Sequence, residues 1–380
     1  MRKNLLTSTL LLGVVCLFAT DFQMKKGTPE IQSISKLAFG DQGILFLGDA
    51  ISAKVFALDL GDEEQLSVDK GINIGDLEGE IGSILGTSAE NVLIHDMAVN
   101  PRSKNVYFSV SRARAEWASR WQLPNELAHA DVLIRLSPGG DFDLVDLENI
   151  LFSEMNLPNP VGSDQEHRWK KGVKLRVDAI TDLSYHAGKI YVAGLSNEEF
   201  AASMWVAPFP FEKEVEISTL EIFHGAHGEY ETHAPIRTFI PYELNQASHI
   251  IAAYLCTPLV TFELDKLTDQ DHIKGKTVAE FGSGNYPIDM VAYESNGKKL
   301  ILMSNSALPL MVFDPKEVEA YEGEITTEVE GYLAGIPYTP KSGSGTQQLD
   351  NFNEKYILAT QRLPSGKLAL ASLPKERLTQ

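Results

Sequence analysis

The sequence predicts an all-β fold built as a single β-propeller, and two observations lead to that prediction. The first is a strand–turn–strand–loop–strand unit over residues 287–314, in which a Glu-Ser-Asn-Gly turn separates the first two apolar strands. Such a unit cannot bury both of its faces alone and needs neighbours of its own kind. The second is that the chain supplies them, because the unit recurs in six copies that begin near Ser35, His95, Thr181, Pro235, Pro287 and Gln347.

The number of copies predicts a ring of six blades over residues 28–380. Six copies leave room for about four strands each, which is the content of a propeller blade. The last copy ends after its third strand, at 367–372, and a lone strand near Thr28 precedes the first copy. We therefore expect the segment near Thr28 to supply the missing outer strand and close the ring. The connection over 147–173 is long, so a seventh blade there is the alternative count.

The repeated segments resemble the blades of NHL, YVTN and gluconolactonase-type propellers. Pro235-Ile and Pro287-Ile open matching inner strands, and Pro258-Leu and Pro309-Leu open matching third strands. The resemblance covers nearly the whole chain and implies the architecture alone. Those families favour glycine where this chain has aspartate, so their metal ligands do not carry over to Asp96, Asp182 and Asp289.

Composition and the first residues indicate where the protein works. The formal net charge of −19 repels a phosphate backbone, which argues against a nucleic-acid partner. A basic start, an apolar run over 5–18 and Ala19 predict a signal peptide over 1–19, and hence a secreted or periplasmic protein. Lipidation at Cys16 is the alternative. We expect no membrane-spanning segment in the mature chain, and Cys256 is then its only cysteine, so the fold must rely on a large core.

The unusual residues gather in loops that a propeller places on one face. In this architecture the loops into inner strands and the loops between second and third strands open together at one end of the channel. Nearly every unusual polar or glycine-rich segment of the chain falls in such a loop. Binding residues often lie on loops held by a rigid scaffold. Two insertions, 112–129 with Trp117 and Trp121 four residues apart, and 147–173, predict lids over that face. Alternatively, the tryptophans only anchor the insertion.

One polar position recurs at the start of every inner strand and predicts a ring at the channel mouth. Such a ring could hold a cation or an anionic ligand. Alternatively its charges pair with one another, Lys36 with Asp96, and Arg237 with Asp182 and Asp289, because partly buried charges need partners. The six positions are Lys36, Asp96, Asp182, Arg237, Asp289 and Gln348.

Histidines predict a second candidate site. His224, His227 and His233 lie in one loop with Glu229 and Glu231, a set that could bind zinc or copper. His95, beside the expected channel mouth, could add a ligand. We expect such a site to lack thiolates. The alternative is a polar surface loop that happens to contain three histidines.

A third candidate lies in the loops after the second strands. Asn197 and Glu198 offer oxygen ligands for a cation such as calcium, and Glu198 could instead be a general base or simply solvated. Asn305 occupies the corresponding loop of the fifth copy and joins the predicted ligand-binding residues. The sequence contains no Gly-x-Ser-x-Gly nucleophile motif and no phosphate-binding loop.

These patterns predict an exported propeller that binds a small ligand, a divalent metal ion (zinc, copper or calcium) or a protein partner at the loop-rich face. Two enzymatic alternatives remain open. One is a metal-dependent hydrolase or lactonase at the channel mouth, which rests on architecture alone. The other is a quinone-cofactor oxidoreductase, for which Trp117, Trp121, Arg112 and Arg114 offer stacking and charge.

Overall fold

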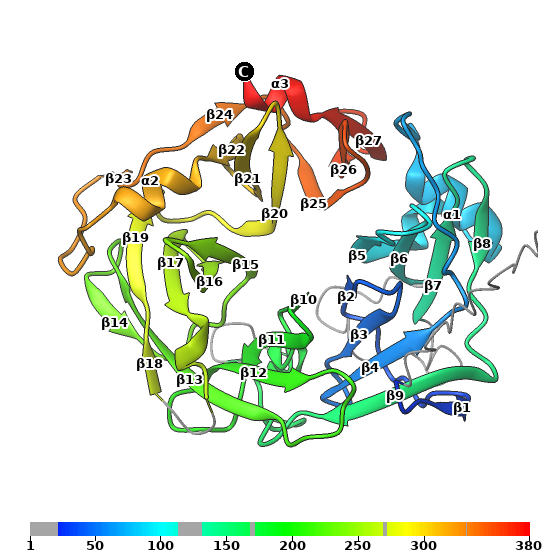
Figure 1. The fold of residues 1–380 in the computed structure, drawn as a ribbon, viewed down its shortest axis with the longest axis horizontal. Coiled ribbons are helices and arrows are strands. Elements are labelled where there is room, and N and C mark those ends of the chain that lie inside the picture. The colour runs from blue at the N-terminus through cyan, green and yellow to red at the C-terminus, as the bar shows by residue number, and fades with distance from the viewer. Residues whose placement is uncertain (1–21, 113–130, 168–171, 269–271, 332) are drawn as a thin grey trace, which may run out of the picture.

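The computed structural model describes residues 22–112, 131–167, 172–268, 272–331 and 333–380. Their strands form six small sheets arranged around a central channel, so the protein is a six-bladed β-propeller (Figure 1). The expected fold class and the architectural resemblance are thereby confirmed. The predicted signal peptide, the core of the 112–129 insertion with Trp117 and Trp121, and Arg114 lie outside the described residues.

Four blades follow one another in chain order. Each begins with an inner strand and adds strands outward by antiparallel pairing, as the alternating apolar segments and tight turns predict, except that β18 pairs in parallel with β13. The first of the four contains β10 (Asp182–His186), β11 (Lys189–Leu195), β12 (Ala202–Pro208) and β13 (Glu216–His224), with β14 (Glu229–Glu231) and β18 (His272–Lys274) at its outer edge. The second contains β15 (Thr238–Leu244), β16 (Ala247–Ala253), β17 (Pro258–Glu263), β19 (Lys276–Glu280) and β23 (Ala334–Gly335). The third contains β20 (Pro287–Ser295), β21 (Lys298–Asn305), β22 (Leu310–Phe313) and β24 (Thr339–Lys341), and the last contains β25 (Thr346–Asn351), β26 (Tyr356–Arg362) and β27 (Leu368–Pro374).

The first two blades are interleaved. One contains β2 (Lys36–Phe39), β3 (Leu45–Asp49) and β4 (Lys54–Asp59), and its outer strands are β9 (Ile150–Asn156) and β1 (Lys25–Gly27). The other contains β5 (Leu93–Val99), β6 (Val106–Ser111), β7 (Asp131–Leu136) and β8 (Phe142–Leu144). Strand β9 therefore completes the first blade only after the chain has built the second. The seventh blade considered over 147–173 does not exist, since β9 belongs to a six-bladed ring.

The order of blades around the ring differs from their order in the chain. Inner strands contact one another in the cyclic order β25, β5, β2, β10, β15, β20, as the colours of Figure 1 also show. The chain thus leaves the first blade at β4, passes to the far side of the β5 blade, and only then builds that blade. The ring remains closed although the chain doubles back.

The ring is closed by a segment other than the predicted one. The strand expected near Thr28 is β1, and it pairs with β9 of the first blade rather than with the last blade. Instead, Ile74 forms an antiparallel bridge with Leu370 of β27, and the backbone N–H of Ile72 donates to Ser372 Oγ at 2.7 Å. This segment takes the outer position of the last blade and leads into the neighbouring β5 blade.

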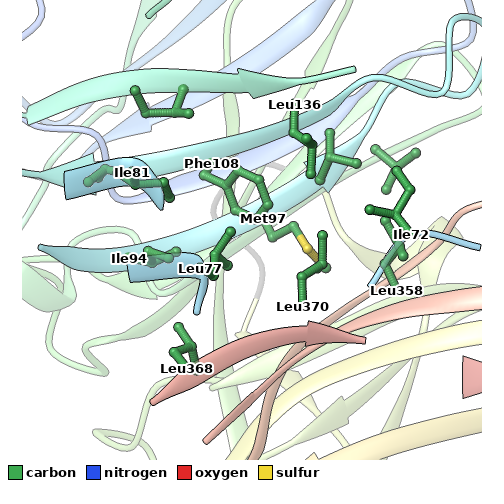
Figure 2. Packing of buried hydrophobic residues seen from close by; sticks show 14 of the residues in the cluster. Ile72, Leu77, Ile81, Ile94, Met97, Phe108, Leu136, Leu358, Leu368 and Leu370 are labelled. Atoms are coloured by element: carbon green, nitrogen blue, oxygen red, sulfur yellow. The ribbon is translucent and has the colours of Figure 1, made fainter. Parts of the chain in front are cut away.

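Apolar side chains fill the boundaries between blades. Figure 2 shows one such cluster, in which Phe108 of the β5 blade faces Leu358 and Leu370 of the last blade. Helix α1 (Leu77–Leu85) buries Leu77 and Ile81 in the same cluster. Each fully buried side chain of this size contributes about 1.5–3 kcal/mol, so the large core needs no disulfide.

Short helices lie at the blade edges. In the part of the chain that the structure describes they are α1, α2 (Pro315–Ala320) and α3 (Lys375–Thr379), with single 3₁₀ turns at Ala89–Asn91, Leu175–Asp178 and Leu264–Lys266. Within the described residues, none of the helices combines the length and the apolar character that crossing a bilayer requires.

Candidate functional site

The inner strands enclose a channel cavity of about 430 Å³ whose lining carries several aspartates. Asp96, Asp182 and Asp289 lie on β5, β10 and β20, and Asp350 lies on β25. The first three are members of the predicted polar ring, so the structure brings these residues together around the channel. Asp350 was not among the predicted residues.

Each of these four carboxylates joins two neighbouring blades. One carboxylate oxygen accepts the backbone N–H of the following residue, as in Asp182 with Leu183 (2.9 Å) and Asp289 with Met290 (2.7 Å). The other oxygen accepts a backbone N–H from the next inner strand around the ring, and all four bonds run in the same direction. Those donors are Leu37 to Asp96 (2.8 Å), Phe239 to Asp182 (2.9 Å), Leu349 to Asp289 (2.6 Å) and Val99 to Asp350 (2.7 Å).

Lys36 supplies the positive charge of this ring. Its Nζ lies 3.9 Å from Asp96 Oδ1, which is the ion pair expected from the sequence. Burial opposes the charge on Lys36, but Asp96, Asp182 and Asp289 more than offset that cost and raise its pKa. One cation cannot balance three carboxylates. Burial, together with the neighbouring carboxylates, raises the pKa of Asp182 to about 6 and that of Asp289 well above its usual range.

Arg237 does not join the ring. Its Nη1 donates to Asp178 Oδ1 at 2.9 Å, and its guanidinium lies 5.4 Å from the ring centre of Tyr286. The predicted pairing of Arg237 with Asp182 and Asp289 is therefore wrong. Strand pairing explains why. Thr238 pairs with Ala253 in the same way that Asp182 pairs with Ala193, so Thr238 occupies the ring position of this blade and Arg237 precedes it by one residue. A one-residue shift moves a strand side chain to the other face.

The histidine loop forms a β-hairpin that stacks two imidazoles. Strand β13 ends at His224, and β14 returns beside it, pairing His224 with Glu229. The backbone N–H groups of His227 and Gly228 both donate to the His224 carbonyl, at 3.1 and 2.9 Å. This turn places the ring centres of His224 and His227 3.8 Å apart.

A carboxylate holds both imidazoles from one side. Glu231 Oε1 lies 2.6 Å from Nδ1 of His227, in a hydrogen bond, and 2.9 Å from Nδ1 of His224. The contact between Glu231 and His224 has the distance of a hydrogen bond but not its angles, so Nδ1 of His224 has no hydrogen-bond partner. Burial opposes ionisation of Glu231, but the two imidazoles outweigh it and lower its pKa.

Cys256 completes the group. It lies between β16 and β17, and one ligand atom from each of His224, His227 and Cys256 lies within 4.8 Å of the others. The expectation that a metal site here would lack thiolates is thus wrong for the geometry observed. The backbone N–H of Gly284 donates to Cys256 Sγ at 3.3 Å, and the Cys256 N–H donates to the Asn285 carbonyl at 2.9 Å. The loop that contains Gly284 continues to Tyr286, the partner of Arg237.

Several buried polar atoms beside this group have no hydrogen-bond partner. They are both ring nitrogens of His224, Oε2 of Glu280 and the hydroxyl of Tyr254. His224 is 2% exposed and Glu280 is 1% exposed, so water does not satisfy these atoms freely. Burial raises the pKa of Glu280 to about 7 and that of Tyr254 well above its usual value. Unsatisfied buried polar atoms are rare in native proteins and call for an explanation.

The backbone at the turn is shaped for close packing against Glu280. The N–H of Gly225 donates to Glu280 Oε1, and a Cβ at Gly225 would come within 2.8 Å of Glu280 Cγ. Glycine is therefore required here for a steric reason. Together, His224, His227, Glu231, Cys256, Glu280 and Tyr254 form what we call the histidine pocket.

The other predicted metal ligands do not join the histidine pocket. His233 Nδ1 contacts Thr232 Oγ1 at 2.9 Å, and His95 Nε2 contacts Ser111 Oγ at 2.6 Å on the β5 blade. Among the described residues, neither belongs to the group of close metal-ligating atoms. Glu229 is exposed beside His224.

The remaining predicted ligand-binding residues occupy separate loops. Glu198 accepts a hydrogen bond from Asn159 at 2.6 Å and lines an open groove of about 820 Å³ on the side of the β10 blade. Asn197 stands next to it, and its N–H donates to the Asn159 carbonyl. Asn305 is buried and caps its loop, with Oδ1 accepting from Ala307 and Nδ2 donating to Asn285.

Sequence reasoning missed Cys256, Glu280 and Tyr254 as members of the histidine pocket. Cys256 falls in a loop after a second strand, on the predicted functional face, and that placement was a usable signal. Glu280 and Tyr254 lie at strand ends within apolar stretches, and no motif marks them.

No family model and no curated protein sequence matches this chain. Among solved structures, the chain is similar to a putative oxidoreductase (glucose dehydrogenase) of Thermus thermophilus. The TM-score is 0.36 and the identity 9%, over 92% of this chain and 99% of that one. At these values the similarity transfers neither an activity nor a ligand to this chain, whose architecture rests on its own strand pairing.

Proposed function

We propose that the protein is an exported β-propeller that binds a transition-metal ion in the histidine pocket, on its loop-rich face. The observation that carries the proposal is the convergence of His224, His227 and Cys256, in which the buried ring nitrogens of His224 have no hydrogen-bond partner. Neutral imidazole is a good ligand for zinc and copper, and an ion would satisfy one of the two unpaired nitrogens of His224.

The pocket has the features of an open metal site. His224 is almost fully buried, whereas the His227 side chain is 44% exposed, so one side of the group faces solvent. A site with three protein donors and an open side leaves a coordination position for water or a small ligand. The loop from Gly284 to Tyr286 connects this pocket to Arg237, because the Gly284 N–H donates to Cys256 Sγ and the Arg237 guanidinium lies over the Tyr286 ring.

One observation favours a hydrolase or lactonase as the second candidate. Glu280 places a buried carboxyl with one unpartnered oxygen beside the two imidazoles. A carboxylate at that position would take a proton from water or substrate bound at the open side of the pocket. The quinone alternative depends on Trp117, Trp121 and Arg114, outside the described residues, and nothing described in the structure favours it.

The test is a titration of zinc and copper into metal-free protein, followed by calorimetry and by elemental analysis after dialysis. We expect one tightly bound ion in the wild type and loss of that ion in the double variant His224→Ala, His227→Ala. The matched control His233→Ala should bind as the wild type does. Equal binding by the double variant, or no binding by the wild type, would overturn the proposal.

Export is tested separately. Expression of the full chain followed by mass spectrometry of the mature N-terminus should find cleavage after Ala19. A retained first segment, or a lipid on Cys16, would contradict the predicted processing and leave the metal proposal unaffected.

A further inference from the structure

We propose that Cys256 is a third, thiolate ligand of the bound ion, that Glu231 orients both imidazoles, and that the resulting two-histidine, one-cysteine centre takes copper. This inference rests on the proposed metal-binding function and goes further, because it assigns the ligand set and the kind of ion. It stands on the grouping of donors and on the buried, unpartnered ring of His224 that faces them.

The position of Glu231 decides which histidine nitrogens are available. Its Oε1 lies next to Nδ1 of both imidazoles, at 2.9 Å for His224 and 2.6 Å for His227. Metal-binding histidines commonly donate their other ring N–H to a carboxylate, which fixes the tautomer and aims the free nitrogen. Glu231 therefore accepts from Nδ1–H of His227 and leaves the Nε2 lone pair of that ring for the ion. The same oxygen lies beside Nδ1 of His224 without a directed hydrogen bond, and Nε2 of His224 has no partner.

Cys256 is placed to complete this pair. Metal–nitrogen and metal–sulfur bonds of about 2.0–2.3 Å put tetrahedral donors about 3.5 Å apart. The donors here lie within 4.8 Å of one another, so an ion would draw them together by a small movement. The Gly284 N–H donates to Sγ at 3.3 Å and positions the sulfur, as hydrogen bonds from outside the ligand set position metal ligands.

The donor set favours copper over zinc. Divalent copper binds a given nitrogen and sulfur site more tightly than zinc does, and two imidazoles with one thiolate form a trigonal set typical of copper centres. Structural zinc sites usually have four protein ligands, whereas the described residues supply a group of three close donors from histidine and cysteine.

The experiment is an anaerobic titration of Cu²⁺, and separately of Co²⁺, followed by visible absorption. Wild-type protein should develop an intense thiolate-to-metal charge-transfer band at one equivalent. The Cys256→Ser variant should lose the band and should still bind the ion, with an affinity lowered by about 10-fold or more. The Glu231→Gln variant should keep the band, with an affinity lowered about 10–100-fold. His233→Ala is the matched control and should behave as the wild type does.

The outcomes separate this inference from the function on which it rests. Binding without the band, equal in wild type and Cys256→Ser, would remove Cys256 from the ligand set and leave the two-histidine site standing. Failure of copper to displace bound zinc would overturn the assignment of the ion. No binding of any ion by the wild type would overturn both proposals together.

Discussion

The channel ring and the histidine pocket are both buried polar clusters, and they satisfy their polar atoms in opposite ways. In the ring, Asp182 and Asp289 use both carboxylate oxygens to accept backbone N–H groups, one of them from the neighbouring blade. In the pocket, His224, Glu280 and Tyr254 keep polar atoms without partners. The ring thus resembles a structural network, and the pocket resembles a site prepared for a ligand.

This difference teaches that charge alone does not identify a binding site. Three of the four ring aspartates and Lys36 were predicted from the sequence as a candidate site, yet the hydrogen bonds of the ring hold the blades to one another. The pocket has fewer charges, but a fold that leaves buried polar atoms unpaired bears a cost of about 1–3 kcal/mol for each. A ligand that satisfies those atoms offsets the cost, so unsatisfied groups are the better indicator of function.

The largest expected effect comes from the buried ion pair beside the ring. Replacing Arg237 by Ala leaves Asp178 buried without its cation and should lower the free energy of unfolding by about 3–5 kcal/mol. Chemical denaturation measures the change. The exposed Lys266, which pairs with Glu263, is the control, and Lys266→Ala should unfold as the wild type does. A stable Arg237→Ala variant would mean that Asp178 is solvated or protonated.

The next effect tests whether the ring aspartates join the blades. Asp289→Ala removes the acceptor of the Leu349 N–H and should lower the free energy of unfolding by about 1–3 kcal/mol. The exposed carboxylate of Asp143, paired with Arg135, is the control, and Asp143→Ala should cost less than about 1 kcal/mol. Equal losses in the two variants would argue that the ring contributes no more than a surface pair.

The ring should also make stability depend on pH. Burial raises the pKa of Asp350 to about 7 and that of Asp182 to about 6, above the ordinary value of 3.8 for an unfolded aspartate. The folded state therefore holds these protons more tightly, and stability should fall as pH rises from 4 to 7, by up to about 1.4 kcal/mol per pH unit for each group. Denaturation at several pH values measures the slope. Asp350→Asn should flatten it, and an unchanged slope would contradict burial of this carboxyl.

The smallest effect is the most direct comparison, because it makes the same chemical change in two places. Tyr254→Phe removes a buried hydroxyl that has no partner and should leave the stability of the metal-free protein unchanged or slightly higher. Tyr107→Phe removes a buried hydroxyl that donates to Asp62 at 2.8 Å and should cost about 1–3 kcal/mol. Thermal unfolding of both variants is the measurement. If Tyr254→Phe is the more destabilising of the two, the histidine pocket is better satisfied than its geometry indicates.

The sequence by itself determined the repeating unit, the number of blades and one ion pair. Alternating apolar residues and tight turns are local features, and strand–turn–strand pairing follows from them within each copy. Lys36 and Asp96 paired as expected because both occupy the same position of neighbouring inner strands. The histidine loop was also recognisable, since its residues lie close together in the chain.

Only the tertiary structure decided the blade order, the partner of Arg237 and the composition of the histidine pocket. The order depends on pairings between distant segments, β9 with β4 and Ile74 with Leu370, and local sequence patterns do not specify which distant segment a strand pairs with. The partner of Arg237 depends on a register that a one-residue shift inverts. Cys256 meets His224 because two blades pack side by side, and a contact made by packing is set by the whole ring rather than by either loop.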